Sequence, residues 1–295
     1  MFEWIGVPPQ VLFGQLLIGL INGAFYAMLS LGLAVIFGLL NIINFAHGAL
    51  YMMGAFTAWF LLRYLGLGYW PALMLAPIII GLFGAVLERL LLRRLYYLDH
   101  LYGLLLTFGI ALMIQGVFRY YFGSSGQPYT IPALLQGGVN LGFMVLPIYR
   151  GWVVAISLAV CLATWFVIER TRLGSTLRAA TENPTLTQAF GINVPRLVTL
   201  TYAFGVALAA FSGVLAAPIF QVSPQMGSDL IIIIFAVVVI GGMGSIMGSI
   251  ITGFALGLVE GLTKVFYPEA SNTVIFVIMA IVLLIKPTGL FGRAA

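Results

Sequence analysis

The sequence predicts an all-α polytopic integral membrane protein, and three observations lead to this fold class. The chain is 62% hydrophobic and only 7% charged, with a mean hydropathy of +1.13, whereas soluble domains carry about 25% charged residues. Its apolar runs reach the ~20 residues that a membrane-spanning helix needs. The alternating pattern of an outer-membrane barrel is absent, and helices are the other way to satisfy backbone polar groups in lipid.

Apolar runs between turn or charge clusters define the expected helices. We expect about nine transmembrane helices (eight to ten), over residues 11–40, 47–66, 71–92, 101–122, 151–168, 197–219, 229–243, 244–263 and 272–286. The first run is about 45 Å long if wholly helical, more than a ~30 Å hydrocarbon core requires, so it must tilt, break or project. The run 229–243 is short and ends in GGMGS, so a half-span that turns back is an alternative.

The chain start and the single cysteine carry no targeting or redox signal. The first ten residues contain Glu3 and no basic residue, and the apolar run after them is too long for a signal peptide, so we expect the first helix to be retained. Cys161 lies in an apolar run and is interpreted as a small buried hydrophobe. One cysteine excludes an internal disulfide.

Basic residues predict the orientation, because Lys and Arg stay preferentially on the cytoplasmic side. If 169–196 is cytoplasmic, alternation also places 88–100 and the C-terminal tail inside. These segments hold nine of the thirteen basic residues, namely Arg89, Arg93, Arg94, Arg170, Arg172, Arg178, Arg196, Lys286 and Arg293. The N-terminus is therefore predicted outside and the C-terminus cytoplasmic. The +5 charge is explained by topology, and no basic and aromatic surface argues for nucleic acid.

One long polar segment, residues 169–196, interrupts the apolar chain. Within it, NPTLTQAFG predicts a short helix with Asn183 as N-cap, Pro184 at the first helical position and Gly191 as the C-terminal stop. A helix of about seven residues does not persist alone in water, so it needs a partner surface. It is either an ordinary cytoplasmic loop on the headgroups or a docking helix for a soluble partner. The sequence has no GxxxxGK[ST] phosphate loop, which favours docking to an external engine.

Polar residues in the first part of the chain are candidates for a translocation path or a helix break. They are Asn22, Tyr26, Asn41, Asn44 and His47, with Ser30 among them. Buried amides must be paired, line water or bind a ligand. For Asn44 and His47, interhelical hydrogen bonding or a helix break competes with exposure to a substrate path. We do not expect His47 to bind metal, because no second ligand stands at suitable spacing.

Small residues recur at intervals of four in the last third of the chain. They are Gly241, Ser245, Ser249, Gly253, Gly257 and Gly261. On one helix face this stripe would be about 30 Å long and would let another helix approach closely. We interpret the stripe as helix packing, within the chain or against a second subunit. A smooth wall of a translocation path is a compatible alternative.

Ionisable residues are nearly absent from the span centres. Glu88 and Arg89 lie at a cytoplasmic end, and Asp229 and Glu260 lie near outer ends, with Lys264 placed for an i,i+4 pair with Glu260. The lack of a central carboxylate argues against ion coupling. We find no GxSxG or HExxH motif and no paired carboxylates at helical spacing. The chain is therefore not expected to be an enzyme, to hold catalytic residues or to bind a metal.

The segment 123–150 is the longest expected extracytoplasmic loop. It is rich in Gly and Pro and follows an aromatic cluster that fits an interfacial belt, composed of Phe118, Tyr120, Tyr121 and Phe122. A plain loop would need no further explanation.

Three sequence blocks carry a family resemblance. They read GLINGAFYAMLSLGLAVIFGLLNIINFAHGALYMMGAF, RAATENPTLTQAFGINVPRLVTLTYAFGVALAAFSGVLAAP, and VVVIGGMGSIMGSIITGFALGLVEGL followed by KPTGLFGR. Together they resemble the permease subunits of branched-chain amino acid ABC importers, of the LivH type, from about residue 10 to 293. The resemblance implies a single transmembrane permease domain over 1–295 in a bacterial-type inner membrane. It also implies a second permease, two cytoplasmic ATPase subunits and an extracytoplasmic solute-binding protein as partners.

The resemblance also implies residue roles and substrates. The segment 178–192 matches the family's coupling loop, which sits in a cleft of the ATPase and transmits its closure. The implied coupling residues are Arg178, Glu182, Asn183, Pro184, Gln188, Gly191 and Ile192. The loop 123–150 would help to dock the binding protein, and no cofactor is expected on this chain, since the partner subunits use ATP. The implied substrates are branched-chain or other aliphatic amino acids; a urea or short-amide importer permease and an autonomous carrier or channel are the alternatives.

Overall fold

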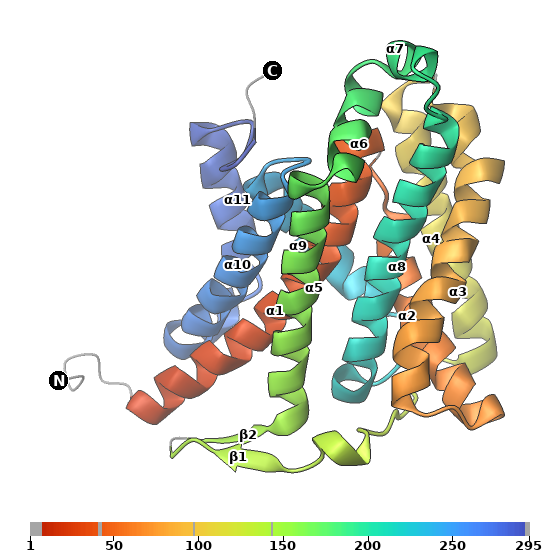
Figure 1. The fold of residues 1–295 in the computed structure, drawn as a ribbon. Coiled ribbons are helices and arrows are strands. Elements are labelled where there is room, and N and C mark those ends of the chain that lie inside the picture. The colour runs from red at the N-terminus through yellow and green to blue at the C-terminus, as the bar shows by residue number, and fades with distance from the viewer. Residues whose placement is uncertain (1–7, 41–42, 97, 143, 293–295) are drawn as a thin grey trace. The chain divides into compact units, whose positions relative to one another are not determined.

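The computed structural model describes residues 8–40, 43–96, 98–142 and 144–292 (Figure 1). Helices dominate these ranges, joined by short turns and one two-stranded sheet. The α-helices are α1 Pro9–Leu40, α2 Ala46–Leu65, α3 Tyr69–Leu90, α4 His100–Phe122, α5 Ile148–Arg170, α6 Arg172–Glu182, α7 Pro184–Ala189, α8 Val194–Phe220, α9 Met226–Gly241, α10 Ile246–Phe266 and α11 Val274–Ile285. The 3-10 helices are η2 Leu92–Leu95, η3 Ala133–Leu135 and η4 Pro268–Ala270.

Six helices in the described ranges are long and apolar enough to cross a membrane. They are α1, α3 continued through η2, α4, α5, α8 and α10, and two shorter apolar helices, α9 and α11, accompany them. These helices fit the predicted all-α polytopic class. Each of the nine predicted runs coincides with a helix, α2 included, but the number of membrane crossings stays a prediction.

The chain divides into two compact units. Unit 1 comprises Met1–Ser30, Ile131–Cys161 and Ile233–Ala295, and unit 2 comprises Leu31–Thr130 and Leu162–Ile232. Three of the four boundaries fall within α1, α5 and α9, so each of these helices contributes residues to both units, and the fourth lies between Thr130 and Ile131. The single permease domain expected from the sequence stays a prediction.

In unit 2, α8 packs along α2 and α3 (Figure 1). Glycine makes the contacts close: a Cβ on Gly54 of α2 would lie 2.4 Å from the Cα of Ala210, and one on Gly84 of α3 would lie 2.9 Å from a methyl group of Val206. The buried core around them consists of Ile36, Ala46, Leu50, Ile80, Leu87, Leu92, Ile110, Tyr202, Val206 and Ala210. Because the residues at these contacts are small, the helices of unit 2 can approach one another closely.

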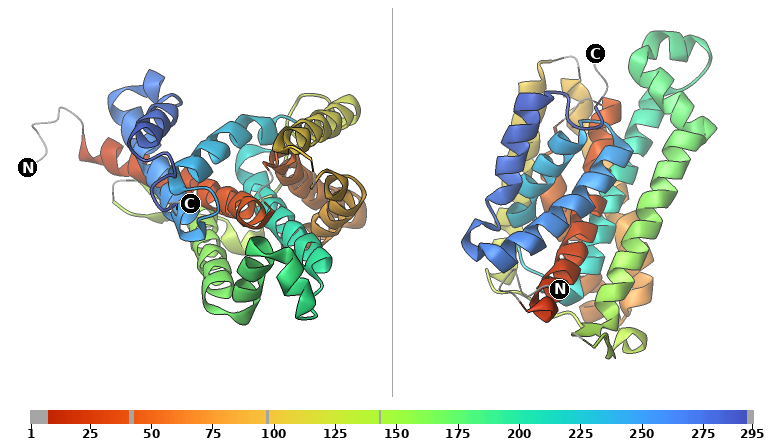
Figure 2. Two further views of the ribbon diagram at one scale, coloured as in Figure 1. Left: turned by 90° about the horizontal axis from the view of Figure 1, so that it is seen from above. Right: turned by 90° about the vertical axis from the view of Figure 1, so that its left-hand side faces the viewer.

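In unit 1, the N-terminal part of α1 lies against α10, as Figure 2 shows in red and blue. A Cβ on Gly257 would be 2.4 Å from the Cα of Gly23, and one on Gly253 would be 2.5 Å from the Cα of Ala27. Gly261 meets the backbone of Gln15 in the same way. The packing interpretation of the small-residue stripe therefore holds for these three positions.

The stripe is not one helix face, and that part of the prediction is wrong. Gly241 ends α9, and Ser245 is the N-cap of α10, where its hydroxyl oxygen accepts from the Gly248 N–H at 3.1 Å. Between them, Gly242 and Gly244 have positive φ values of 100° and 85°, a backbone conformation that interrupts a helix. Ser249 continues on α10, and its hydroxyl donates to the Ser245 carbonyl.

The C-terminal residues finish the end of α9 within unit 1. The Leu290 and Phe291 N–H groups donate to the carbonyls of Ile240 and Gly241 at 2.8 and 3.1 Å. A helix leaves its last carbonyls without intrahelical partners, so these bonds serve as a cap supplied by distant sequence.

The segment 123–150 contains more structure than the expected plain loop. After η3, strands β1 Gly138–Asn140 and β2 Val145–Pro147 pair antiparallel, with Val139 opposite Leu146. Helix α5 then begins at Ile148, three residues before the predicted start.

Candidate functional site: the polar segment between α5 and α8

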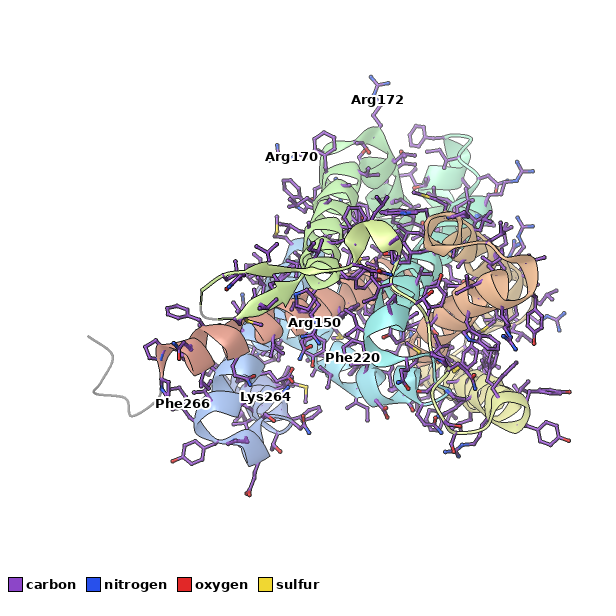
Figure 3. The ribbon with its side chains drawn as sticks, turned by 90° about the horizontal axis from the view of Figure 1, so that it is seen from below. Arg150, Arg170, Arg172, Phe220, Lys264 and Phe266 are labelled. Atoms are coloured by element: carbon purple, nitrogen blue, oxygen red, sulfur yellow. The ribbon has the colours of Figure 1, made fainter. Side chains whose placement is uncertain are left out.

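The polar segment 169–196 folds as two helices, α6 and α7. Helix α7 was predicted from the sequence, whereas α6 was not among the expected helices. A signal was present, because Leu173, Leu177 and Ala180 recur at the i, i+4 and i+7 positions typical of an amphipathic helix. Figure 3 shows Arg172 extending away from the α5–α6 corner, beyond Arg170.

Helix α6 is fixed to the end of α5. Arg178 Nη1 donates to the Ile168 carbonyl at 2.9 Å and lies 3.5 Å from the Glu169 carboxylate. A cation at a helix C-terminus is favoured by the helix dipole, whereas the half-exposed ion pair adds little. Gly174 is in direct backbone contact with Ile168, since an added Cβ would lie 1.6 Å from its carbonyl oxygen. Arg178, predicted as a coupling residue, thus positions α6.

Helix α7 has the predicted ends. The Asn183 side-chain oxygen accepts from the Leu186 N–H at 2.9 Å, and Pro184 occupies the first helical position. Gly191, with φ of 84°, follows the helix end, and its N–H donates to the Gln188 carbonyl at 2.9 Å. The local capping prediction is therefore confirmed, with the helix proper ending at Ala189.

Helix α7 contacts α6 through Thr187 and leaves neighbouring apolar side chains exposed. Thr187 is buried, and its Oγ1 lies 3.0 Å from the Ala179 carbonyl oxygen of α6 and 2.9 Å from that of Asn183. By contrast, Leu186 is 55% and Phe190 is 77% exposed. Both apolar side chains are therefore accessible from outside the chain. Of the remaining predicted coupling residues, Glu182, Asn183, Pro184, Gln188 and Gly191 are exposed and Ile192 is half-buried.

The segment 88–100 meets the end of segment 169–196 at one end of unit 2, where Arg89 and Arg93 share a pocket with Asn193 and Arg196. Glu88 of α3 is completely buried there, and its two oxygens accept from the hydroxyls of Tyr96 and Thr199, each at 2.7 Å. Burial and the bond to Glu88 raise the pKa of Tyr96. The sequence placed Glu88 at a helix end without indicating its burial, because Thr199 is 111 residues away.

The candidate path residues of unit 2 have partners in the protein. Asn44 Nδ2 donates to the Tyr202 hydroxyl at 3.0 Å, and its Oδ1 accepts from the Ala46 N–H at the start of α2. This is the interhelical bond and helix start that the sequence analysis weighed against a substrate path. His47 is buried, with its ring 3.0 Å from where a Cβ on Gly32 would lie. Asn41 lies outside the described residues.

The candidate path residues of unit 1 converge on Glu260. Tyr26 donates from its hydroxyl to Glu260 Oε2 at 2.6 Å, and Asn22 Nδ2 lies 3.5 Å from Oε1. Lys264 forms the predicted i,i+4 ion pair with Glu260. These bonds hold α1 to α10 around a buried carboxylate. A role of these residues in translocation stays a prediction.

Comparison with known proteins identifies the family. Residues 15–283 match the family described as branched-chain amino acid transport system, permease component. The chain belongs to this family. The permease is 32% identical to the high-affinity branched-chain amino acid transport system permease protein BraD of Pseudomonas aeruginosa, over 95% of each chain. The resemblance to LivH-type permeases is confirmed, with 29% identity to LivH of Escherichia coli K12 over 95% of each chain.

More distant relatives give the breadth of the similarity. LivM of Escherichia coli K12, also a branched-chain amino acid permease protein, is 26% identical over 90% of this permease and 67% of its own length. Among solved structures, PsaBC from Streptococcus pneumoniae in complex with Fab matches with a TM-score of 0.49 and 15% identity, over 91% and 89% of the two chains, too weakly to bear on the fold. The family and the apolar helices together make this chain a multi-pass membrane transport subunit.

Proposed function

We propose that this permease is the transmembrane subunit of an ATP-binding-cassette importer, driven by separate cytoplasmic ATPase subunits that grip α7. The observation that carries the proposal is the exposure of two apolar side chains, Leu186 in α7 and Phe190 at its C-cap, on a segment that Thr187 holds against α6. Six residues are too few for a helix that stands alone, so its caps and its contact with α6 prepare it for a partner. The family resemblance supports the same role.

The contacts around α7 provide a route for mechanical coupling. Thr187 ties α7 to α6, and Arg178 with Gly174 ties α6 to the end of α5. Two residues, Ile192 and Asn193, separate Gly191 from the start of α8, and the Asn193 side chain caps that helix at the Arg196 N–H. When the ATPases close on ATP, a displacement of α7 is therefore passed to α5 and α8 as a rigid-body movement.

We also propose a substrate class, partners and a membrane orientation for this permease. The permease carries branched-chain or other aliphatic amino acids, as its relatives are named for doing. It pairs with a second permease, for which the similarity to both LivH and LivM is the support. A solute-binding protein docks on the side of segment 123–150. The N-terminus lies outside and the C-terminus in the cytoplasm of a bacterial-type inner membrane.

Cross-linking from α7 tests the proposal directly. A cysteine placed at the exposed Gln188, in a Cys161→Ser background, is cross-linked in membranes of cells that carry the whole transport system, and the adduct is analysed by mass spectrometry. We expect an ATPase subunit on the adduct. A cysteine at the exposed Asn140, the last residue of β1, is the matched control and should capture no ATPase. An accessible cysteine at 188 that captures nothing would contradict the proposal.

Transport by reconstituted subunits separates the alternatives. We expect ATP-dependent leucine uptake only when the ATPases and binding protein are present. Urea uptake under the same conditions would favour the short-amide importer. Uptake by this chain alone, driven by an ion gradient, would establish an autonomous carrier and refute the ABC mechanism.

A further inference from the structure

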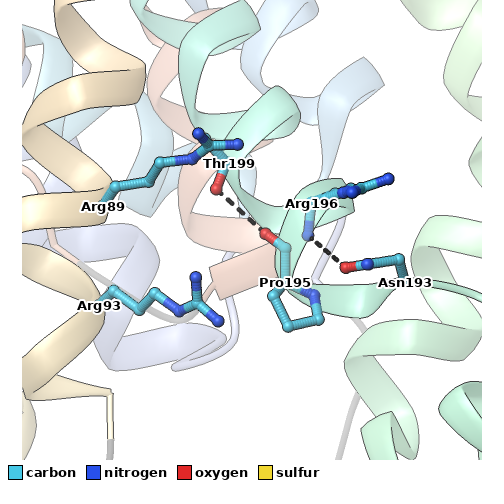
Figure 4. A pocket seen from close by; sticks show the side chains of 6 residues that line it. All are labelled: Arg89, Arg93, Asn193, Pro195, Arg196 and Thr199. Carbon is cyan, nitrogen blue, oxygen red and sulfur yellow. Dashed lines mark hydrogen bonds between the residues drawn. The ribbon is translucent and has the colours of Figure 1, made fainter.

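A basic pocket lies at the end of unit 2 where α3 and η2 meet the start of α8. Its volume is about 270 Å³, and it is lined by Arg89, Arg93, Asn193, Pro195, Arg196 and Thr199. Figure 4 shows Arg89 and Arg93 extending across the pocket toward α8, while the Arg196 guanidinium on the opposite wall is directed away from them. Neither α7 nor the residues that bind Glu260 line this pocket.

The pocket gathers positive charge without a matching negative lining. Within the described ranges, none of its three arginines has a carboxylate oxygen within 4.0 Å. Glu88 lies behind the wall, where it accepts from Thr199, and does not line the space. Neighbouring like charges repel one another, and an anion between them relieves that repulsion. Guanidinium groups bind phosphate oxygens through paired, charge-assisted hydrogen bonds.

The surface beside the pocket indicates where the anion comes from. Val86, Leu90 and Leu91, within about one turn of Arg89, are exposed and apolar. On a membrane-spanning helix such side chains face acyl chains, and arginines at the end of the span lie at the level of the headgroups. Basic pockets between transmembrane helices bind anionic lipid headgroups.

We propose that this pocket binds the phosphate of an anionic phospholipid headgroup, with its acyl chains along the exposed apolar side of α3. Arg89 and Arg93 hold the phosphate, and Arg196 adds to the positive potential. A lipid bound here would sit against the first turn of α8. The proposal requires only that α3 crosses the membrane, so it stands or falls separately from ATPase docking on α7.

Native mass spectrometry of the full-length permease in a neutral detergent tests the proposal. Phosphatidylglycerol and phosphatidylcholine with identical acyl chains are added in equal amounts, and the retained lipid is counted. We expect the wild type to retain phosphatidylglycerol preferentially. In the Arg89→Gln/Arg93→Gln variant the preference should fall about thirtyfold, as expected for losing two basic contacts at a membrane surface.

Matched variants decide between specific binding and surface charge. Arg94→Gln/Arg172→Gln removes the same charge from exposed positions that do not line the pocket. This control should keep the wild-type preference, and an equal loss in it would overturn the proposal. Should the Gln variant elute as misfolded protein, the Arg89→Lys/Arg93→Lys variant decides instead, because it keeps the charge. A lipid preference below that of the wild type supports paired arginine contacts with the phosphate. An unchanged lipid preference overturns the proposal.

Two further results would overturn the lipid assignment. The first is that inorganic phosphate raises the thermal unfolding temperature of the wild type as much as phosphatidylglycerol at equal concentration, which would indicate a soluble anion. The second is that Arg89→Gln/Arg93→Gln keeps its lipid but loses the ATPase cross-link from position 188, which would make the arginines a protein contact. Absence of the ATPase cross-link from position 188 when Arg89 and Arg93 are both intact would contradict only the proposed function.

Discussion

At the scale of single residues, Tyr129 is a buried side chain whose hydroxyl group is unpaired in the described part of the chain. Its side chain is buried, and within residues 8–40, 43–96, 98–142 and 144–292 its hydroxyl has no hydrogen-bond partner. Burial, with a smaller contribution from Tyr69, raises the pKa of this hydroxyl to about 12. The folded state therefore strongly favours the neutral form, while leaving a polar group unsatisfied at some cost in stability.

We expect Tyr129→Phe to increase the free energy of unfolding by about 1 kcal/mol near pH 8, because it removes the unsatisfied hydroxyl. The wild type should lose stability as the pH rises from about 10, the ordinary tyrosine pKa, toward 12, because only the unfolded chain ionises readily there. The variant should lack that loss at position 129. Thermal unfolding of both proteins at pH 8, 10 and 11.5 measures the difference, with the exposed Tyr120→Phe as control. Equal stability at pH 8 and parallel losses above pH 10 would contradict the expectation.

At the scale of elements, the structure explains which parts the sequence analysis predicted correctly. The ends of α7 were predictable, because Asn183, Pro184 and Gly191 act within a few residues of themselves. The nine apolar runs were predictable for the same reason, as each is a local property of composition. The partners of Glu88 and Glu260 were not, since the bond from Tyr26 to Glu260 spans 234 residues. The predicted stripe runs across the break between α9 and α10, where two glycines with positive φ interrupt the helix.

The crossing of α1 and α10 gives a prediction about packing. Gly257→Leu should lower the free energy of unfolding by about 3 kcal/mol, because its side chain would have to displace the backbone of Gly23. Gly116→Leu on α4 is the matched control, since a Cβ there meets nothing within 4 Å. Thermal unfolding in detergent, with the yield of correctly inserted protein, measures both. Equal behaviour of the two variants would show that α10 does not depend on this contact.

At the scale of the whole molecule, transport is expected to depend on how firmly α7 is held. Its six residues are capped at both ends, and Thr187 holds them against α6 while Leu186 stays exposed. A loosened α7 would still allow insertion, because none of its residues belongs to an apolar span. Coupling and folding should therefore be separable by mutation.

The double variant Asn183→Ala/Pro184→Ala should lower ATP-driven leucine uptake about fivefold or more, because a lost N-cap costs about 1 kcal/mol of helix stability. Insertion and docking of the binding protein should be unchanged. Thr185→Ala, exposed on the same helix, is the control. Uptake by reconstituted complexes, with ATPase activity measured in parallel, provides the test, and normal uptake by the double variant would rule out α7 as the coupling element.

The composition of unit 1 has a consequence for biosynthesis. Unit 1 combines early and late parts of the chain, so the hydrogen bond from Tyr26 to Glu260 cannot form until the ribosome has added 234 further residues. That takes at least about 10 s at ordinary elongation rates. Unit 2 has all its residues once Ile232 has been made. Until α10 has been made, the first helix therefore lacks its final neighbour in unit 1, and the insertion machinery must hold or shield its glycine-rich side.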